Sequence, residues 1–419
     1  MTWLQRYRAV SFFRSSVWLP PVVGMVAALL LHRVIQQVDL ALGWQASVAP
    51  DGARSVLGAL VSSMLTFIVF VFSILLVAVQ LASAQLTPRI IALVYRSNVI
   101  KFSLTIFVYT FTYTLAALSR IEQSVPQISQ WVAIYSNIFC IALFIYMIDY
   151  VGKSLRPISL LTRIGNAGER VLREVYPRSV SVTDAAPANA VPRPDAEPSC
   201  VVASAHTGTV LAFDVDGLRE IAQRTDCVIE LVPQVGNFVT RGDLLFRVYG
   251  HAIADHQLDH AVAIGPERTI EQDPEFAFRV IVDIACKALS PAINDPTTAV
   301  LALDQIHRLM RVVTTRQLDT GRVLDDTGRL RLMYRTPDWE DFVGLSFTEI
   351  RHYGRESFQV VRRMRAMLEN LITIAPPKRV ALLHEELELL SRGIARDFRD
   401  PEDQVRAACG DSLGVGGAT

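Results

Sequence analysis

Four long apolar segments in the first 150 residues constrain this chain more than any other feature. They run approximately from Val17 to Val38, Val56 to Gln85, Phe102 to Leu118 and Trp131 to Tyr150. Each is long enough to cross a bilayer as a helix, which takes about 20 mostly apolar residues. The sequence therefore predicts an all-α membrane domain of four transmembrane helices over residues 1–178, including a basic juxtamembrane segment at 153–178.

Arginine and lysine are distributed unequally around these segments. Nine of them lie before the first segment, between the second and third, and after the fourth: Arg6, Arg8, Arg14, Arg89, Arg96, Lys101, Lys153, Arg156 and Arg163. The opposite loops offer Arg33, Arg54 and Arg120. Because cytoplasmic loops carry the excess of positive charge, both termini are predicted to be cytoplasmic. The first segment also has some features of a signal peptide.

Between their ends the four segments are interpreted as free of Asp, Glu, Lys and Arg, which argues against proton pumps and voltage sensors. The second segment instead places Ser62, Thr66, Ser73 and Gln80 on one side of a helix. These four are candidates to line a polar path formed between subunits. Ser and Thr are also typical of tight helix–helix packing, and the pattern alone favours packing while leaving the polar path open.

The rest of the chain has the composition of a soluble protein. Residues 179–199 are rich in Pro and Ala and predict a linker. Residues 200–250 predict a small hammerhead-like β module that resembles a barrel-sandwich hybrid, and residues 251–409 a mainly helical cytoplasmic domain. No lysine occurs from Ser154 to Cys286, so the module cannot carry a lysine-bound prosthetic group. Residues 410–419 predict a disordered tail, and the fold class is a membrane all-α domain plus a cytoplasmic α+β domain with amphipathic helices.

Aspartate followed by proline precedes three amphipathic runs, at Asp273, Asp295 and Asp400. An aspartate can cap the free N–H groups of a helix, and proline fits the first helical position. In "ALSPAINDPTTAV", one helix is predicted to end at Ser290 and the next to begin after Asp295. A helix start can also attract an anion, but the aspartate already occupies the positive end. The stretch therefore favours a structural corner over a ligand site.

These phrases also carry a resemblance. "GPERTIEQDPEF", "ALSPAINDPTTA" and "QLASAQLTPRI", together with four amino-terminal spans, are similar to a bacterial family catalogued as predicted membrane proteins of domain of unknown function 2254. The resemblance covers nearly the whole chain and implies a multi-pass protein of the bacterial inner membrane, with no activity attached. It also implies that "RTIEQD" and "SPAINDP" form one cluster, with Arg268 paired to Asp273 or Asp295. The matching positions are Gln85, Pro88 and Arg89 at the membrane edge, and Arg268, Thr269, Gln272, Asp273, Ser290, Pro291, Asn294, Asp295 and Pro296 in the cluster.

No nucleophile elbow, phosphate loop, dinucleotide fingerprint or HExxH motif occurs, so the chain is expected not to be an enzyme and to use no cofactor. Five scattered cysteines without a CxxC argue against a metal site, and zero net charge argues against nucleic acid. The expected partners are the lipid bilayer and further copies of the chain. Two functions remain: a homo-oligomeric channel or small-solute pore with a cytoplasmic vestibule, or a membrane-anchored sensor or scaffold for an unspecified ligand or protein.

Overall fold

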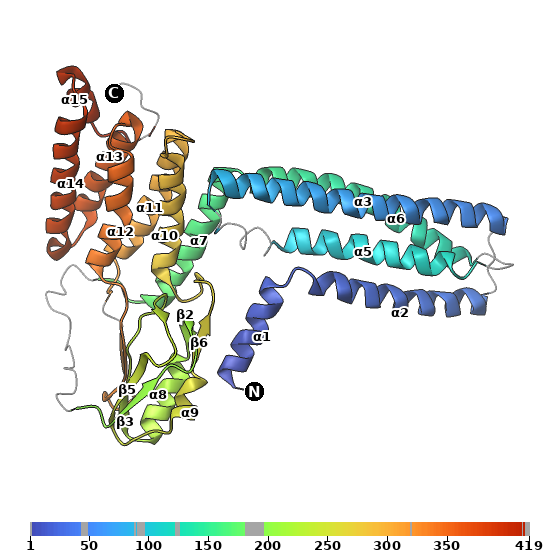
Figure 1. Cartoon of the computed structure of the whole chain (residues 1–419), viewed down its shortest axis with the longest axis horizontal. Helices are drawn as coiled ribbons and strands as arrows, with labels where there is room; N and C mark the ends of the chain where they lie inside the picture. Colours follow the sequence, from blue (N-terminus) through green and yellow to red (C-terminus); the bar gives the residue numbers. More distant parts are fainter. Residues whose placement is uncertain are drawn as a thin grey trace. The chain divides into compact units, whose positions relative to one another are not determined.

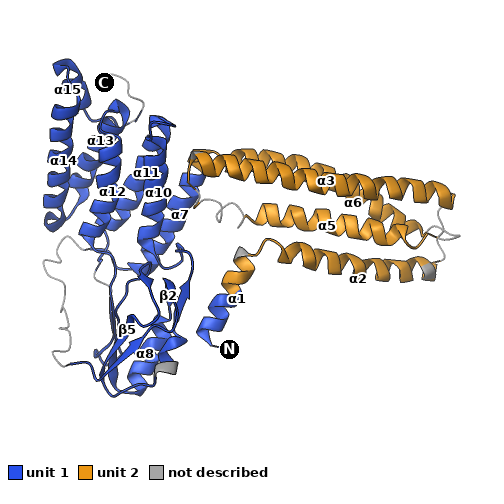
Figure 2. Ribbon diagram, viewed as in Figure 1, with its two compact units in different colours: residues 1–9, 160–419 blue, residues 10–159 orange. Residues whose placement is uncertain are grey.

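The chain folds into two compact units in the computed structural model, which describes residues 2–42, 49–87, 89, 97–121, 126–180, 197–318, 321–412 and 414. Figure 2 shows them in different colours: unit 1 comprises residues 1–9 and 160–419, and unit 2 comprises residues 10–159. Unit 2 is built of long helices, whereas unit 1 combines two small sheets with a set of helices. The predicted combination of apolar helices with an α+β region is confirmed.

Unit 2 contains four helices that are long and apolar enough to cross a membrane, which confirms the four predicted segments. They are α2 (Leu19–Leu42), α3 (Pro50–Gln85), α5 (Asn98–Leu118) and α6 (Gln127–Ser154), preceded by α1 (Trp3–Ser15). Helix α5 packs against the other three and is the most buried of them (Figure 1). Outward-facing positions of the bundle are mostly large and apolar, as a lipid environment requires.

Helix α3 is longer than a bilayer requires. Its 36 residues span about 54 Å at 1.5 Å per residue, whereas the hydrocarbon core is about 30 Å thick. The helix ends at Gln85, and Leu86 has left the helical conformation. The end agrees with the predicted stop before "TPRI", whereas the start at Pro50 lies six residues before the predicted one.

Charged residues do occur inside one of the four helices. Arg33 and Asp39 lie within α2, so the expectation of spans without Asp or Arg is wrong for this helix. Asp39 is buried, and its two carboxylate oxygens accept the backbone N–H groups of Ile128 and Ser129, each at 3.0 Å. The carboxylate thus caps the first turn of α6, where a negative charge is favoured, and this contact explains its burial.

Small residues set the spacing between α2 and α5. A Cβ atom at Gly24 would lie 2.7 Å from the side chain of Thr105, so only glycine allows the two helices to approach this closely. Ala28, one turn further along α2, is completely buried. This is the small-residue packing that membrane helices use in place of a hydrophobic driving force.

Two antiparallel-rich sheets form the β part of unit 1. One has the strand order β1-β5-β3-β8-β7, in which only β3 and β8 run parallel, and the other the order β4-β2-β6. Apolar side chains of both sheets share one core with α8. The strands are β1 (Cys200–Ala203), β2 (Gly208–Phe213), β3 (Cys227–Leu231), β4 (Phe238–Val239), β5 (Leu244–Gly250), β6 (Val262–Gly265), β7 (Arg322–Leu324) and β8 (Leu330–Tyr334).

The β part therefore draws on more of the chain than residues 200–250. Strand β6 follows that range directly, and β7 and β8 come from a segment about 70 residues further on, within the part expected to be mainly helical. Strand β8 confirms the strand predicted from "RLRLMYR", and it pairs with β3 at Ile229, Glu230 and Leu231. Its position inside the sheet joins the module to the helices that follow.

The remaining helices of unit 1 pack on one another, with α10 against α11 and α12, and α13 against α11 and α14. Helix α8 lies against β3 and β8. These helices are α7 (Pro157–Val175), α8 (Val215–Arg224), α9 (Asp255–Asp259), α10 (Pro274–Ala288), α11 (Pro296–Thr314), α12 (Trp339–Tyr353), α13 (Phe358–Ile374), α14 (Pro377–Asp397) and α15 (Pro401–Ala407).

Helix α7 is the basic segment that was expected to belong to the membrane domain and to lie at lipid headgroups. From Leu160 onward it is instead part of unit 1, and its apolar face is buried there. A Cβ atom at Gly168 would lie 2.6 Å from the Cβ of Ala277 in α10, and Gly165 makes a similarly close approach to Arg308 in α11. Its apolar face is covered by protein, and the proximity of its basic residues to lipid headgroups stays a prediction.

The end of the chain is ordered further than expected. Asp411 lies within the segment predicted to be disordered, but it is buried, and its backbone N–H donates to the carbonyl of Arg362 at 3.1 Å. The C-terminal segment thus packs on α13 at least as far as this residue.

Candidate functional site

Helix α10 separates the two motifs that the sequence singles out. Asp273 caps its start by accepting the N–H of Phe276 at 3.0 Å, and Asp295 caps the start of α11 by accepting the N–H of Thr298 at 3.0 Å. Both predicted caps are confirmed. Asp400 precedes α15 in the same way, but its side chain makes no capping hydrogen bond.

The two motifs do not form one cluster. The 15 residues of α10 place "RTIEQDP" and "SPAINDP" about 22 Å apart, at opposite ends of the helix. Arg268 accordingly pairs with Asp273 and not with Asp295. The expectation of a shared cluster failed because the length of α10 lies between the two phrases.

The "SPAINDP" stretch makes a compact corner. The backbone N–H of Asn294 donates to the Ser290 carbonyl at 2.9 Å, and that of Asp295 to the Ala288 carbonyl at 2.8 Å. Asn294 has φ +48°, a left-handed conformation that asparagine tolerates. Pro291 is exposed, and Pro296 occupies the first turn of α11. Ser290, Asn294, Asp295 and Pro296 therefore each have a role in the turn, as a structural corner requires.

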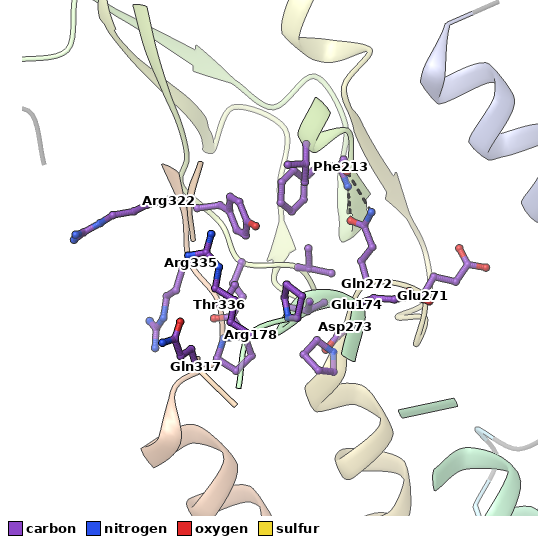
Figure 3. A pocket seen from close by; sticks show the side chains of 18 residues that line it. Glu174, Arg178, Phe213, Glu271, Gln272, Asp273, Gln317, Arg322, Arg335 and Thr336 are labelled. Carbon is purple, nitrogen blue, oxygen red and sulfur yellow. Dashed lines mark hydrogen bonds between the residues drawn. The ribbon is translucent and has the colours of Figure 1, made fainter. Parts of the chain in front are cut away.

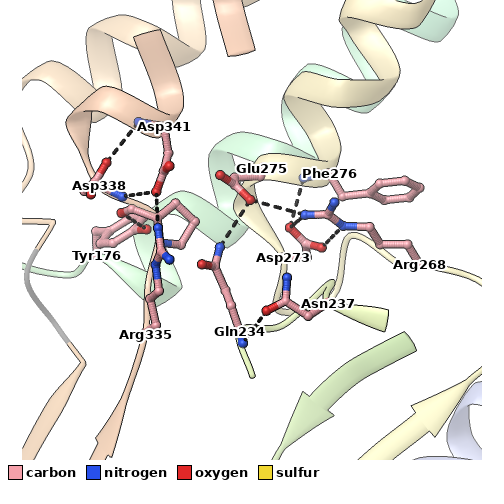
Figure 4. A network of polar contacts seen from close by, with 11 residues as sticks. Tyr176, Gln234, Asn237, Arg268, Asp273, Glu275, Phe276, Arg335, Asp338 and Asp341 are labelled. Atoms are coloured by element: carbon pink, nitrogen blue, oxygen red, sulfur yellow. Dashed lines mark hydrogen bonds and ion pairs between the residues drawn. The ribbon is translucent and has the colours of Figure 1, made fainter. Parts of the chain in front are cut away.

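The "RTIEQDP" stretch belongs to a partly buried polar network (Figure 4). The guanidinium of Arg268 donates to both carboxylate oxygens of Asp273, which is 1% exposed, and to Glu275 at 3.3 Å. It also lies 5.6 Å from the ring centre of Phe276. Gln272 holds the end of β2 by exchanging two hydrogen bonds with the backbone of Phe213, at 3.0 and 3.3 Å.

Glu275 is a carboxylate of this network whose pKa is raised. Burial and the adjacent negative charge of Asp273 raise its pKa to about 6, against the opposing effect of Arg268. Its carboxylate accepts a hydrogen bond from the side-chain amide of Gln234 at 3.2 Å. Thr269, which also matches the family pattern, has a buried hydroxyl without a partner among the described residues.

A cavity of about 410 Å³ opens beside this network. Gln272, Asp273 and Pro274 line it, and the other walls come from the end of α7, the β3–β4 loop and the segment after β8 (Figure 3). None of the "SPAINDP" residues lines it. The structure thus places one of the two motifs at a cavity and the other at a corner.

Sequence reasoning did not identify the other residues of this cavity. Arg178, Arg322 and Arg335 line it together with Tyr334, and they come from three separate segments. No short motif links them, because only the pairing of β8 with β3 and the return of the chain after α11 bring them to one place.

The four pore-lining candidates lie on the exposed face of α3. Ser62, Thr66, Ser73 and Gln80 are all exposed, at the side of the helix opposite its buried residues. Those buried residues are Ala53, Leu57, Met64, Val71, Leu75, Val79 and Ala82. The stripe therefore lines no path inside one chain, although it is available to a second chain.

Two hydroxyls of this stripe are bonded within their own helix. Thr66 Oγ1 donates to the Ser62 carbonyl at 3.1 Å, and Ser73 Oγ donates to the Val69 carbonyl at 2.9 Å. Such bonds satisfy a hydroxyl even against lipid. The side-chain amide of Gln80 cannot be satisfied by a single bond to its own helix. Gln80 is therefore the position at which a water-filled path and a lipid environment differ most.

The membrane-edge candidates lie at the C-terminal end of α3 and just after it. Gln85 is the last residue of α3, Pro88 lies outside the described residues, and Arg89 is exposed. The backbone N–H of Arg89 lies 3.5 Å from the hydroxyl oxygen of Thr87.

A second polar group, buried inside unit 2, was not predicted. The hydroxyl of Ser129 lies 3.3 Å from Nδ1 of His32 and 3.3 Å from the hydroxyl of Tyr113. Asn137 donates to the hydroxyl of Thr114 at 3.1 Å in the same interface between α5 and α6. These contacts join three helices, so no single-helix pattern indicates them. They hold the bundle together.

No group of three or more His, Cys, Asp or Glu side chains suited to a metal occurs in the described part of the chain. A family model described as "Predicted membrane protein (DUF2254)" matches residues 14–370. The chain belongs to this family. DUF2254 assigns a membrane location and no activity, so the site must be interpreted from its own chemistry.

The curated proteins similar to this DUF2254 chain include uncharacterised proteins of Mycobacterium tuberculosis and Mycobacterium bovis. Each is 27% identical over 434 aligned positions, which cover 96% of this chain and 81% of the relative. The similarity therefore extends over both units. No solved structure matches the chain.

Proposed function

We propose that several copies of this membrane protein assemble into a channel or small-solute pore, with α3 of each copy facing the central path. Unit 1 is then a cytoplasmic vestibule, and the protein is not an enzyme. The observation that carries the proposal is the position of Ser62, Thr66, Ser73 and Gln80 on the exposed face of α3.

The geometry of α3 supports this arrangement. At 100° per residue the four side chains fall within about 40° of one another, on the face opposite the one packed into the bundle. Water or a partner helix can satisfy the whole stripe, whereas lipid leaves the side-chain amide of Gln80 without a partner even where the hydroxyls of Thr66 and Ser73 are bonded within α3. A ring of α3 helices satisfies it.

Two apolar side chains on the same face refine the proposal. Val69 and Leu76 are exposed and lie about 35° and about 55° from the centre of the stripe. In a ring of α3 helices they would form two apolar constrictions between the polar positions. Such constrictions can close a pore by excluding water.

We also propose that both termini lie in the cytoplasm and that the membrane is the bacterial inner membrane. The excess of Arg and Lys on one side of the four spans supports this orientation. A reporter fused after Thr419 should be active only in the cytoplasm, and one inserted near Asp51 only in the periplasm. Periplasmic activity at the carboxyl terminus contradicts the orientation.

Cysteine accessibility tests the pore. Single cysteines replacing Ser62, Thr66, Ser73 and Gln80 should react in membranes with a small charged thiol reagent, because a thiolate forms only where water reaches. A cysteine replacing Ile145, which is exposed on α6, is the matched control and should be protected by lipid. Protection of all four stripe positions in an assembled oligomer excludes the channel.

Flux measurements distinguish conduction from packing. Reconstituted protein should pass ions or a small solute, and Ser73→Phe should reduce this flux while the oligomer remains assembled. A packing role for the stripe predicts the opposite: Ser73→Phe would disrupt the oligomer, seen by crosslinking or size-exclusion chromatography, because an overfilled interface cannot close.

The second candidate function is a membrane-anchored sensor or scaffold. It is favoured by the cavity in unit 1 and by its contact with the "RTIEQDP" residues. In this function the spans serve for assembly. The β module, which we interpret as similar to a barrel-sandwich hybrid, contributes Gln234 and Val235 to the ligand site. Ligand binding without any flux would favour this candidate over the pore.

A further inference from the structure

The cavity in unit 1 differs in chemistry from one side to the other. Figure 3 shows Arg178, Arg322 and Arg335 on one side and Glu271 and Gln272 on the opposite side. Its volume of about 410 Å³ lies within the range of about 300–1,000 Å³ that is usual for small-molecule sites. A site of this size accepts a metabolite and not a macromolecule.

The arginine side chains of this cavity have few ion-pair partners among the described residues. Arg178 and Arg322 make no ion pair with any carboxylate in the described residues, and the Nη1 atom of Arg322 is buried there without a hydrogen-bond partner. Arg335 pairs with Asp341 at 3.5 Å, but its side chain is 65% exposed, so this contact holds it weakly. The side chain of Arg322 extends away from the cavity in Figure 3, so the guanidinium groups of Arg178 and Arg335 are the ones available to a ligand.

The acidic side chains nearby do not neutralise these arginines. The carboxylate of Asp273 is occupied by Arg268 and by the N–H of Phe276. The side chain of Glu271 extends away from the cavity in Figure 3. Glu174 is the remaining carboxylate of the lining, and it faces the guanidinium groups of Arg178 and Arg335 across the same cavity.

An apolar wall completes the site. The rings of Phe213 and Tyr334 meet edge to face, with 4.8 Å between their centres, and Val215 and Val235 line the cavity with them. Burial raises the pKa of Tyr334, so its hydroxyl stays protonated at neutral pH. The combination of cations and an apolar wall is suited to an anion that carries an apolar body.

We propose that this cavity binds a small organic anion, with its phosphate or carboxylate on the arginine side and its apolar body against Phe213 and Tyr334. Glu174 to Arg178, at the end of α7, form one wall, and α7 begins at Pro157, directly after the last span ends at Ser154. Binding is therefore expected to change flux through the spans, and this second clause rests on the proposed pore.

Phenyl phosphate and benzoate are the probes, and the test uses the purified full-length protein in detergent. At least one of them should bind measurably by calorimetry and raise the melting temperature; which one binds more tightly distinguishes a phosphate from a carboxylate ligand. Inorganic phosphate, which lacks the apolar body, should bind at least about tenfold more weakly. Benzylamine, which reverses the charge, should not bind.

Arginine variants locate the binding. Arg178→Ala and Arg335→Ala are exposed substitutions that should keep the melting temperature of the free protein and weaken probe binding by about tenfold or more each. Arg224→Ala, at an exposed position on α8, is the matched control and should leave binding unchanged. Equal binding of benzylamine, no binding of either anion, or unchanged binding in both cavity variants overturns the site.

Flux separates this inference from the pore itself. Flux that responds to the bound probe in the unsubstituted protein, and not in Arg178→Ala, supports the coupling. If flux does not change when the probe is bound, the coupling is wrong, whereas the binding site is unaffected. Probe binding by a protein without any flux upholds the site and contradicts the proposed pore.

Discussion

The two aspartates that flank α10 perform the same local task in different surroundings. Each caps a helix that begins with proline, and each accepts a backbone N–H at 3.0 Å. Asp273 is buried and also pairs with Arg268 beside a cavity, whereas Asp295 is partly exposed and its further partner is the hydroxyl of Thr298 at 2.5 Å. Capping is therefore common to both ends of α10, whereas the charge pair beside a cavity is found at the Asp273 end and makes that end the candidate site.

Loss of the buried carboxylate should have the largest effect. Asp273→Ala removes the cap and leaves Arg268 without its main partner, which should lower the free energy of unfolding by about 3–5 kcal/mol. Thermal or chemical unfolding of the purified protein measures it. Asp273→Asn keeps an acceptor for the cap and should fall between the wild type and Asp273→Ala. If Asp273→Ala lowers the free energy of unfolding no more than Asp295→Ala does, the two ends of α10 do not differ in the way proposed.

The next largest effect is a pH dependence of the free energy of unfolding, which is expected at the Asp273 end of α10 and not at the Asp295 end. The pKa of Glu275 lies at about 6, above its ordinary value of 4.5, so its favourable contribution is complete below pH 4.5 and is lost as the pH rises through 6. Glu275→Gln should therefore gain stability relative to the wild type between pH 4.5 and 7.5, by about 2 kcal/mol. Melting temperatures at the two pH values test this. An identical difference at both would show that Glu275 is ionised normally.

Asp295→Ala should cost about 1 kcal/mol, the usual value of a helix cap. The same unfolding measurement applies, with Thr298→Ala as a partner variant that removes the hydroxyl and keeps the backbone N–H. Unchanged stability together with a lost activity would instead indicate that the exposed corner binds a ligand.

The smallest effect is expected at the third Asp-Pro step. Asp400 makes no side-chain capping hydrogen bond, so Asp400→Ala should change the free energy of unfolding by less than about 0.5 kcal/mol. A decrease of about 1 kcal/mol in the free energy of unfolding would show that Asp400 caps α15 in solution, as Asp295 caps α11.

The features predicted correctly from sequence are those that depend on neighbouring residues. The four apolar helices, the caps at Asp273 and Asp295 and the end of α3 at Gln85 each follow from a short stretch of chain. The pairing of Arg268 with Asp273 was one of two options, and the length of α10 decided between them.

The features that were missed depend on distant partners. The apolar face of α7 is visible in the sequence, but the residues of α10 and α11 that cover it are not. Asp39 is buried in α2 because it caps α6, about 90 residues later. The arginines of the cavity likewise meet only after β8 has entered the sheet.

The close packing of Gly168 against Ala277 and Leu309 also has a consequence for synthesis. These two partners follow Gly168 by 109 and 141 residues, and the spans that precede α7 are made first. At about 5–20 residues per second, α7 leaves the ribosome on the order of 10 s before the helices that cover it. The apolar face of α7 therefore lacks its native partners during that interval, until α11 is complete.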